Sequence, residues 1–185
     1  ASDAWNKELS TVEYDASRDL KTIFYTALYH AYFFPSAYDD VNGQYRGSDQ
    51  KVYSGDGKPN YTLFSLWDTY RALHPLLTIT QAGRIDDLIN SMLNIYKQQG
   101  KLPVWHLSGN ETNTMVGYSA VPVVVDAYMK GHRGFDVKLA YEAVKQSAMQ
   151  KSDGIQYIQK LAFIPADSVN ESVAKALEYA IDDAC

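Results

Sequence analysis

The sequence has a single cysteine, no long apolar run and no block of basic residues, and each absence narrows what the chain can be. With Cys185 as its one thiol, the chain cannot form an internal disulfide or a cysteine-based metal site. The longest apolar run, residues 120–127, is interrupted by Pro122 and Asp126 and falls far short of the ~20 residues that a membrane-spanning helix needs. We therefore expect no membrane span.

A net charge of −5 without a cluster of lysine or arginine argues against nucleic acid as a partner, because phosphate binding needs a concentrated basic surface. Aromatic residues are plentiful instead, with 15 tyrosines and 3 tryptophans among 185 residues. Such side chains suit a core and also suit stacking on flat ligands such as sugar rings. The length fits a single domain, although it exceeds the most common size of ~100–150 residues.

Apolar residues repeat at helical spacing along most of the chain and predict about seven helices. The expected ranges are 2–14, 17–33, 80–99, 117–130, 137–149, 153–161 and 173–181, the last with Leu177 and Ala180 facing inward. Because strands and helices do not alternate, we expect an all-α fold. No fixed repeat of 34–47 residues is present, which disfavours an α-solenoid and leaves an α/α toroid as the better interpretation.

Residues 36–63 differ in character, since glycine and proline interrupt short tyrosine and valine segments. Asn42-Gly43 is typical of a type I′ turn, and it predicts a β-hairpin excursion near residues 38–55. Long excursions from a helical scaffold commonly carry functional side chains.

Aromatic and ionisable residues, which often bind ligands, are concentrated in Phe64-Ser-Leu-Trp-Asp-Thr-Tyr-Arg-Ala-Leu-His-Pro75. With Ser65 as N-cap and Pro75 as the end, this stretch predicts a short helix that carries Trp67 and Asp68 in its first turn. Asp68 and Arg71 would then share a face. A helix-surface ion pair beside two buried aromatic residues is the alternative, and the stretch alone does not decide between them.

A second such segment is Leu102-Pro-Val-Trp-His-Leu-Ser-Gly-Asn-Glu-Thr112, which fits neither a helix nor a strand and which we expect to be a loop. Trp105, Asn110 and Glu111 lie close together in it. A loop with these residue types favours a binding function, and a solvated acidic turn is the alternative. On the residues alone, Asp68 and Glu111 could be a pair of carboxylates that act as general acid and general base.

Six blocks of sequence, in order along the chain, resemble the glycoside hydrolase family 92 α-mannosidases. They are Phe24-Tyr-Thr-Ala-Leu-Tyr-His30, Phe64–Leu76, Leu102-Pro-Val-Trp105, Gly109-Asn-Glu-Thr112 with Met115-Val-Gly-Tyr118, Asp126-Ala-Tyr-Met-Lys-Gly131, and Ser172-Val-Ala-Lys-Ala-Leu-Glu-Tyr-Ala180. The resemblance extends over essentially the whole chain.

The resemblance implies an exported glycosidase that removes terminal mannose from α-mannosides of N-glycans or mannans. Members of the family combine an N-terminal β-sandwich domain with a catalytic (α/α)6 toroid, invert the anomeric centre and depend on a calcium ion that contacts sugar hydroxyls. Residues 1–185 would form one segment, the N-terminal half of the toroid. The sandwich domain and the C-terminal half of the toroid would lie outside it.

The sequence also departs from the family pattern. The general acid of the family lies in an Asn-Glu-Pro-type motif and the base in a Gly-Asn-Asp-type motif, and neither motif occurs in these residues. Ser119 stands where members usually have histidine, and Ala184 stands where they have tryptophan. We therefore expect no catalytic residue here and expect most calcium ligands to lie elsewhere.

The resemblance changes the expected role of the segments Phe64–Pro75 and Leu102–Thr112 from catalysis to substrate binding. The residues expected to bind the mannose-containing oligosaccharide are Trp67, Asp68, Arg71, Trp105, Asn110 and Glu111. Asp68 would accept hydrogen bonds from hydroxyls of the terminal mannose, with Arg71 orienting its carboxylate.

Two alternatives to a mannosidase segment are a non-catalytic helical carbohydrate-binding module and a helical scaffold for protein partners. The scaffold is disfavoured because the distinctive residues cluster in two segments instead of repeating along a surface. Half a toroid would leave helix faces uncovered, so we expect them to contact the remainder of the polypeptide or, in an isolated chain, a second copy.

Overall fold

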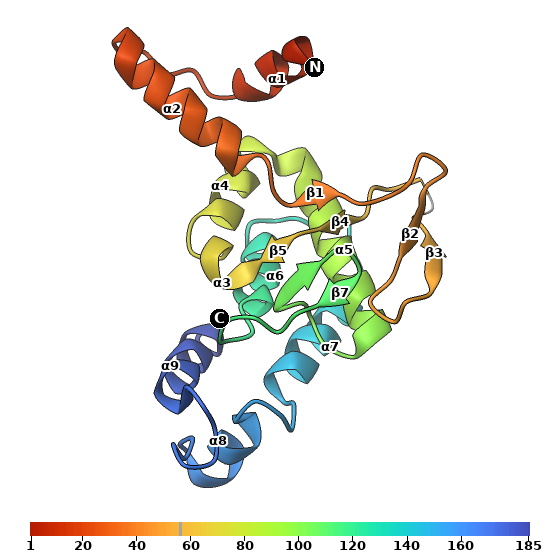
Figure 1. The fold of residues 1–185 in the computed structure, drawn as a ribbon, viewed down its shortest axis with the longest axis vertical. Coiled ribbons are helices and arrows are strands. Elements are labelled where there is room, and N and C mark those ends of the chain that lie inside the picture. Colours follow the sequence, from red (N-terminus) through yellow and green to blue (C-terminus); the bar gives the residue numbers. More distant parts are fainter. Residues whose placement is uncertain (56) are drawn as a thin grey trace.

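The structure is a computed structural model that describes residues 1–55 and 57–185. About half of the described residues are helical, and the strands form three small antiparallel sheets (Figure 1). The helices are α1 (Ser2–Leu9), α2 (Arg18–Ala31), α3 (Leu66–Thr69), α4 (Leu73–Thr80), α5 (Ala82–Gln99), α6 (Ala120–Met129), α7 (Val137–Ala148), α8 (Ile155–Leu161) and α9 (Ser172–Asp182).

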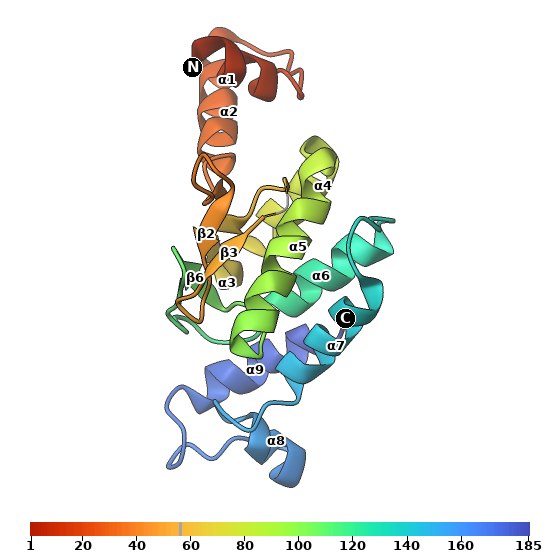
Figure 2. The same cartoon turned by 90° about the vertical axis from the view of Figure 1, so that its right-hand side faces the viewer.

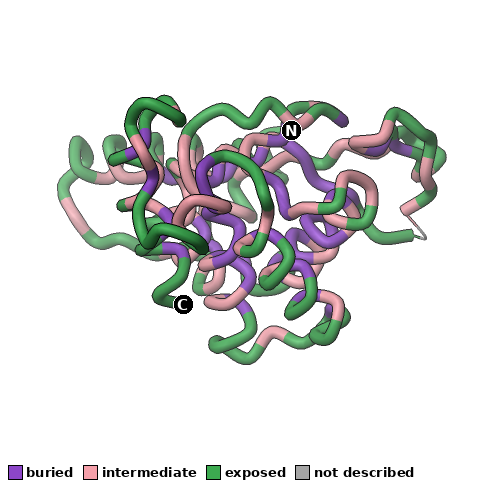
Figure 3. Tube along the Cα trace, turned by 90° about the horizontal axis from the view of Figure 1, so that it is seen from below, coloured by how far each residue is buried: buried purple, intermediate pink, exposed green. Residues whose placement is uncertain are grey.

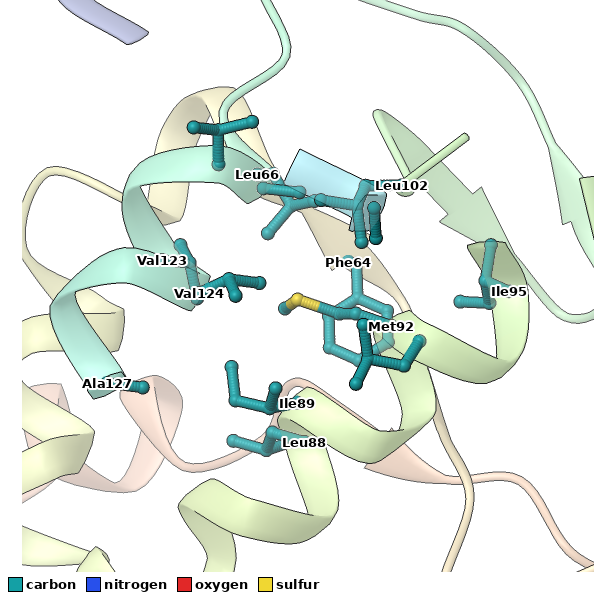
Figure 4. Packing of buried hydrophobic residues seen from close by; sticks show 14 of the residues in the cluster. Phe64, Leu66, Leu88, Ile89, Met92, Ile95, Leu102, Val123, Val124 and Ala127 are labelled. Carbon is teal, nitrogen blue, oxygen red and sulfur yellow. The ribbon is translucent and has the colours of Figure 1, made fainter. Parts of the chain in front are cut away.

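The core is organised around α5, whose apolar residues recur at the spacing that places them on one buried face. Ile89, Met92 and Leu93 are each exposed by 1% or less. Figure 4 shows Met92 beside the ring of Phe64, across from the side chains of α6. Because α6 is apolar on nearly every face, it packs between α4, α5 and α7. Buried residues accordingly gather at the centre of the molecule (Figure 3).

The expectation of an all-α fold is wrong in detail, because seven short strands accompany the helices in the described part of the chain. They are β1 (Ser36–Ala37), β2 (Gln44–Arg46), β3 (Val52–Ser54), β4 (Tyr61–Thr62), β5 (Phe64–Ser65), β6 (Trp105–Leu107) and β7 (Asn110–Glu111). β1 pairs with β4, β2 with β3, and β5, β6 and β7 form one sheet in that order. The segment expected to be a loop at 102–117 thus contains two strands.

The hairpin predicted near residues 38–55 is confirmed, but its turn is not at Asn42-Gly43. β2 begins after that dipeptide and pairs with β3 in antiparallel register, with Tyr45 opposite Tyr53. Asn42-Gly43 instead closes an earlier turn, in which the Gly43 N–H donates to the Asp40 carbonyl at 2.8 Å. Gly43 has a φ of +78°, which glycine adopts without strain. The dipeptide therefore forms a tight turn, but it does not join the paired strands.

The stretch Phe64–Pro75 is not one helix, as the sequence predicted. It contains β5, the single turn of α3 and the start of α4. Pro75 lies in the first turn of α4, where a helix tolerates proline because the N–H groups there have no intrahelical partner. Proline at this place therefore marks the beginning of a helix and not its end.

The last helix, α9, also turns a different face inward from the one predicted. Ser172, Tyr179 and Asp182 are buried, whereas Leu177 is 63% exposed and Ala180 is exposed as well. Helices α1 and α2 extend from one end of the molecule and α8 lies at the other (Figure 2). Among the described residues, none of the helices combines the length and apolar character needed to cross a membrane.

Candidate functional site

The segments Phe64–Pro75 and Leu102–Thr112 meet in the sheet formed by β5, β6 and β7. Ser65 pairs with Trp105, and Phe64 pairs with His106. Because side chains alternate along a strand, Phe64 and His106 face the core, while Ser65 and Trp105 share the opposite face. The pairing brings together residues about forty positions apart in the sequence.

Asp68 lies one helical turn beyond the end of β5, next to this outer face. Its Oδ2 accepts a hydrogen bond from the Ser65 hydroxyl, so Ser65 orients the carboxylate instead of capping α3. Asp68 is exposed, whereas the neighbouring Trp67 is partly buried. The Trp67 indole Nε1 is buried without a hydrogen-bond partner among the described residues. An accessible carboxylate beside an aromatic ring is a suitable combination for binding a sugar.

Trp105 and Asn110 lie on the same face of the sheet. Leu107, two residues beyond Trp105 on β6, pairs with Asn110 on β7. The side chains that face away from the core are therefore Ser65, Trp105, Leu107 and Asn110. Trp105 is partly buried and Asn110 is exposed. Trp105 and Asn110 thus lie on the face on which Ser65 orients Asp68, and their role in sugar binding stays a prediction.

The β2–β3 hairpin supports the β6–β7 turn from the side. The Arg46 Nη2 donates to the Ser108 carbonyl at 3.1 Å, and the Gln50 Nε2 donates to the Gly109 carbonyl at 3.1 Å. Gly109 has a φ of +80°, and a Cβ there would lie 2.9 Å from the Arg46 carbonyl oxygen. Glycine is therefore required at this position both for the turn and for the close approach of the hairpin.

His106 connects the same hairpin to the core side of the sheet. Its Nδ1 lies 3.0 Å from the Thr62 hydroxyl and its Nε2 lies 3.2 Å from the Ser48 hydroxyl. The imidazole is 2% exposed, and burial lowers its pKa, so the neutral form is favoured. His106 therefore has a structural role in joining the hairpin to the sheet.

Glu111 does not share the outer face with Asp68. Its Oε1 accepts from the N–H groups of Trp105 and Asn113, each at 2.9 Å, and its Oε2 accepts from the Val104 N–H at 2.8 Å. These three backbone donors hold both oxygens in place inside the β6–β7 hairpin. The arrangement supports a structural role for Glu111 and does not support pairing it with Asp68 as acid and base.

Arg71 does not orient Asp68, as the sequence predicted. Its Nη2 donates to Oε1 of Glu178 on α9 at 2.7 Å, and its Cζ lies 5.5 Å from the centre of the Trp67 ring. The side chain of Glu178 is 13% exposed. The sequence did not predict a role for Glu178, because nothing in an amphipathic helix signals contact with a residue 107 positions earlier. Ser65 was detectable, since Ser65 and Asp68 have the spacing of a capping motif.

Tyr118 and the end of α9 form a partly buried polar cluster. The Tyr118 N–H donates to Oδ2 of Asp182 at 2.7 Å, and the Tyr118 hydroxyl donates to Oδ1 of Asp183 at 2.5 Å. The rings of Tyr118 and Tyr179 stack with their centres 4.9 Å apart. Burial raises the pKa of the Asp182 carboxyl to about 7, although the Tyr118 N–H opposes this rise. The cluster fixes α9 against the start of α6.

The described residues include no cluster of the side chains that most often bind metals. Within residues 1–55 and 57–185, no three histidine, cysteine, aspartate or glutamate side chains gather closely enough to hold a metal ion. The calcium ion that the family resemblance implies stays a prediction, since calcium also binds carbonyl oxygens.

Comparison with protein families gives a match over the whole chain. The model described as "Glycosyl hydrolase family 92 catalytic domain" matches residues 1–185. Among curated proteins, an uncharacterized secreted glycosidase of Arthroderma benhamiae is 30% identical over 116 aligned residues, covering 54% of this chain and 15% of that protein.

Solved structures with a similar fold include mannosidases of family GH92. A family GH92 α-mannosidase from Bacteroides thetaiotaomicron is 44% identical with a TM-score of 0.94, covering 98% of this chain and 25% of that one. Its complex with mannoimidazole gives the same identity and TM-score, covering 98% of this chain and 24% of that one. An inverting mannosidase of the same family and species is 32% identical with a TM-score of 0.89, covering 98% and 26%. The chain thus spans about a quarter of the solved structures that it matches.

Proposed function

Because the chain belongs to glycosyl hydrolase family 92, whose catalytic-domain model matches residues 1–185, we propose that it is a segment of an exo-acting α-mannosidase that contributes the sugar-binding edge of the active site. Asp68, Trp67 and Trp105 form the centre of that edge, and Asn110 extends it. The substrate would be a terminal mannose of an N-glycan or a mannan. In the intact protein, hydrolysis would invert the anomeric centre.

The surroundings of Asp68 support the assignment of the sugar-binding edge. Asp68 is exposed, follows Trp67 in the chain, and is oriented by Ser65, which pairs with Trp105 of β6. A carboxylate accepts short hydrogen bonds from sugar hydroxyls, and an indole ring offers a flat apolar surface to the sugar ring. The 44% identity to a mannosidase that has been solved with mannoimidazole supports mannose as the sugar.

The chemical step would be performed by residues outside this chain. An inverting glycosidase needs a general acid and a general base far enough apart to admit a water molecule. Glu111 is unsuited to either role because its two oxygens accept from backbone N–H groups. The residues described here would bind and orient the terminal mannose, and tight positioning of this kind contributes to the rate by holding the reacting atoms in place.

We also propose an architecture for the longer polypeptide. The helices would form the N-terminal half of an (α/α)6 toroid, completed by later parts of a longer polypeptide that also includes a β-sandwich domain. Export from the cell is supported by the secreted glycosidase of Arthroderma benhamiae. Most ligands of a calcium ion would come from the later segments, since the described residues form no cluster that could hold it.

Replacement of Asp68 tests the sugar-binding role. In the longer polypeptide, we expect Asp68→Ala to lower kcat/KM for an α-mannoside by roughly 100-fold, because hydrogen bonds to a charged group are worth about 1.5–3 kcal/mol each. The melting temperature should stay nearly unchanged, since Asp68 is exposed. Asp19→Ala, at another exposed position in a helical first turn, is the matched control. A large loss of stability with normal kinetics would show that Asp68 is only structural.

A further inference from the structure

We propose that Glu178, on α9, is a positioning residue for the sugar-binding edge. It holds Arg71, and through Arg71 it fixes Trp67 and Asp68 on α3. The inference rests on the proposed function of Asp68 and adds to it a long-range contact between the end of the chain and the binding residues.

The contact engages both oxygens of Glu178. Oε1 accepts from Arg71 Nη2 at 2.7 Å, and Oε2 accepts from the Tyr70 hydroxyl at 3.3 Å. The hydrogen bond from Arg71 is the main reason that the pKa of the guanidinium is raised. Glu178 therefore binds two consecutive side chains immediately after α3.

Arg71 transmits this contact to Trp67. Its Cζ lies 4.6 Å from the centre of the Tyr70 ring and 5.5 Å from the centre of the Trp67 ring, distances at which a cation is attracted to an aromatic face. The indole Nε1 of Trp67 is buried with no hydrogen-bond partner in the described part of the chain. The orientation of the indole consequently depends on packing, and the guanidinium is part of that packing.

The helix that carries Asp68 needs such support. α3 has four residues, which form a single turn. A helix this short has almost no stability of its own, because the conformational entropy lost in forming the first turn outweighs the hydrogen bond that it gains. β5 fixes its beginning through the pairing of Ser65 with Trp105. Glu178 fixes its end through Tyr70 and Arg71, so the turn that presents Asp68 is held from both sides.

α9 is docked independently of Glu178. Asp182 accepts from the Tyr118 N–H, and the Tyr179 ring stacks on Tyr118. Removal of the Glu178 carboxylate should therefore release Arg71 without releasing the helix. This separation makes the positioning role testable, because the variant should still fold.

The test compares variants of the longer mannosidase polypeptide with an α-mannoside as substrate. We expect Glu178→Ala to lower kcat/KM about tenfold, mainly by raising KM, and Glu178→Gln, which retains an oxygen for Arg71, to recover most of that loss. Glu8→Ala is the matched control, because Glu8 forms a comparable long-range ion pair with Arg84 at 2.9 Å away from the edge. If Glu178→Ala does not fold, the kinetics of Glu178→Gln and Arg71→Lys take its place.

A double variant decides whether Glu178 acts through Asp68. If it does, Glu178→Ala should cause little further loss in an Asp68→Asn background. Full additivity of the two losses, or unchanged kinetics of the folded Glu178 variants beside a defective Asp68→Asn enzyme, would overturn the positioning role. Normal kinetics of Asp68→Asn itself would instead refute the proposed function, so the two failures can be told apart.

Discussion

Asp68, Glu111 and Asp182 are three carboxylates whose surroundings give them different tasks. Asp68 is exposed and held by one serine hydroxyl, so it can accept hydrogen bonds from a ligand. Glu111 is saturated by backbone donors, and Asp182 is completely buried. Sequence alone identified Asp68 and Glu111 as equivalent candidates, because the number of backbone N–H groups around a carboxylate depends on the fold.

Asp182 should make the stability of the chain depend on pH. Its pKa is raised by burial to about 7, whereas an aspartate in an unfolded chain titrates near 3.8. Between these values the unfolded chain releases the proton and the folded chain keeps it. The contribution of Asp182 to stability is therefore fully present below about pH 4 and is lost as the pH rises towards 7.

Asp182→Asn should remove this dependence, because the amide oxygen can still accept from the Tyr118 N–H while no charge is buried. Relative to the variant, we expect the free energy of unfolding of the wild type to fall by at least about 1 kcal/mol between pH 4 and 7. Urea denaturation at several pH values measures the difference. A constant difference across this range would show that Asp182 is not protonated in the fold.

At the scale of elements, the site is built from pieces too short to be recognised by periodicity. β5 and β7 have two residues each, β6 has three and α3 has four. A strand of two residues shows no alternation, and its partner here lies some forty residues away. The sheet forms because Phe64 and Leu66 are buried in the core and Glu111 closes the β6–β7 hairpin.

Longer elements were predicted well because their patterns extend over several turns. The apolar face of α5 agrees with the helical spacing that predicted a helix over residues 80–99, and α7 lies within the predicted range 137–149. The outward Leu177 on α9 was predicted to face inward. Helical periodicity reveals an apolar face but not which neighbour covers it, and in α9 the buried face contains Tyr179 and Asp182 instead.

Glu111→Ala should destabilise the β6–β7 hairpin. The substitution leaves three backbone N–H groups without their acceptor, two of them partly buried, and we expect the free energy of unfolding to fall by roughly 2 kcal/mol. Glu142→Ala, at an exposed position on α7, is the control. Urea denaturation of both variants checks the prediction. Equal stability of the two variants would contradict a structural role and would return Glu111 to the candidate sugar ligands.

At the scale of the whole molecule, apolar surface remains uncovered in several places. A cavity of about 630 Å³ between α6 and α7 is lined mostly by apolar side chains such as Val125 and Val144. Val173, Leu177 and Ile181, spaced four apart on α9, are exposed by 71%, 63% and 44%. Monomeric proteins seldom leave such faces open, so we expect the remainder of a toroid to cover them, and this expectation stays a prediction.

We propose that this segment binds mannose and that the general acid and base lie elsewhere in a longer polypeptide. The most direct test incubates the 185-residue chain with an α-mannoside and calcium and measures free mannose, with the longer polypeptide as positive control. We predict that the longer polypeptide releases mannose and the chain alone releases none. Release of mannose by the chain alone would contradict this proposal, because the general acid and the general base would then both have to lie within residues 1–185.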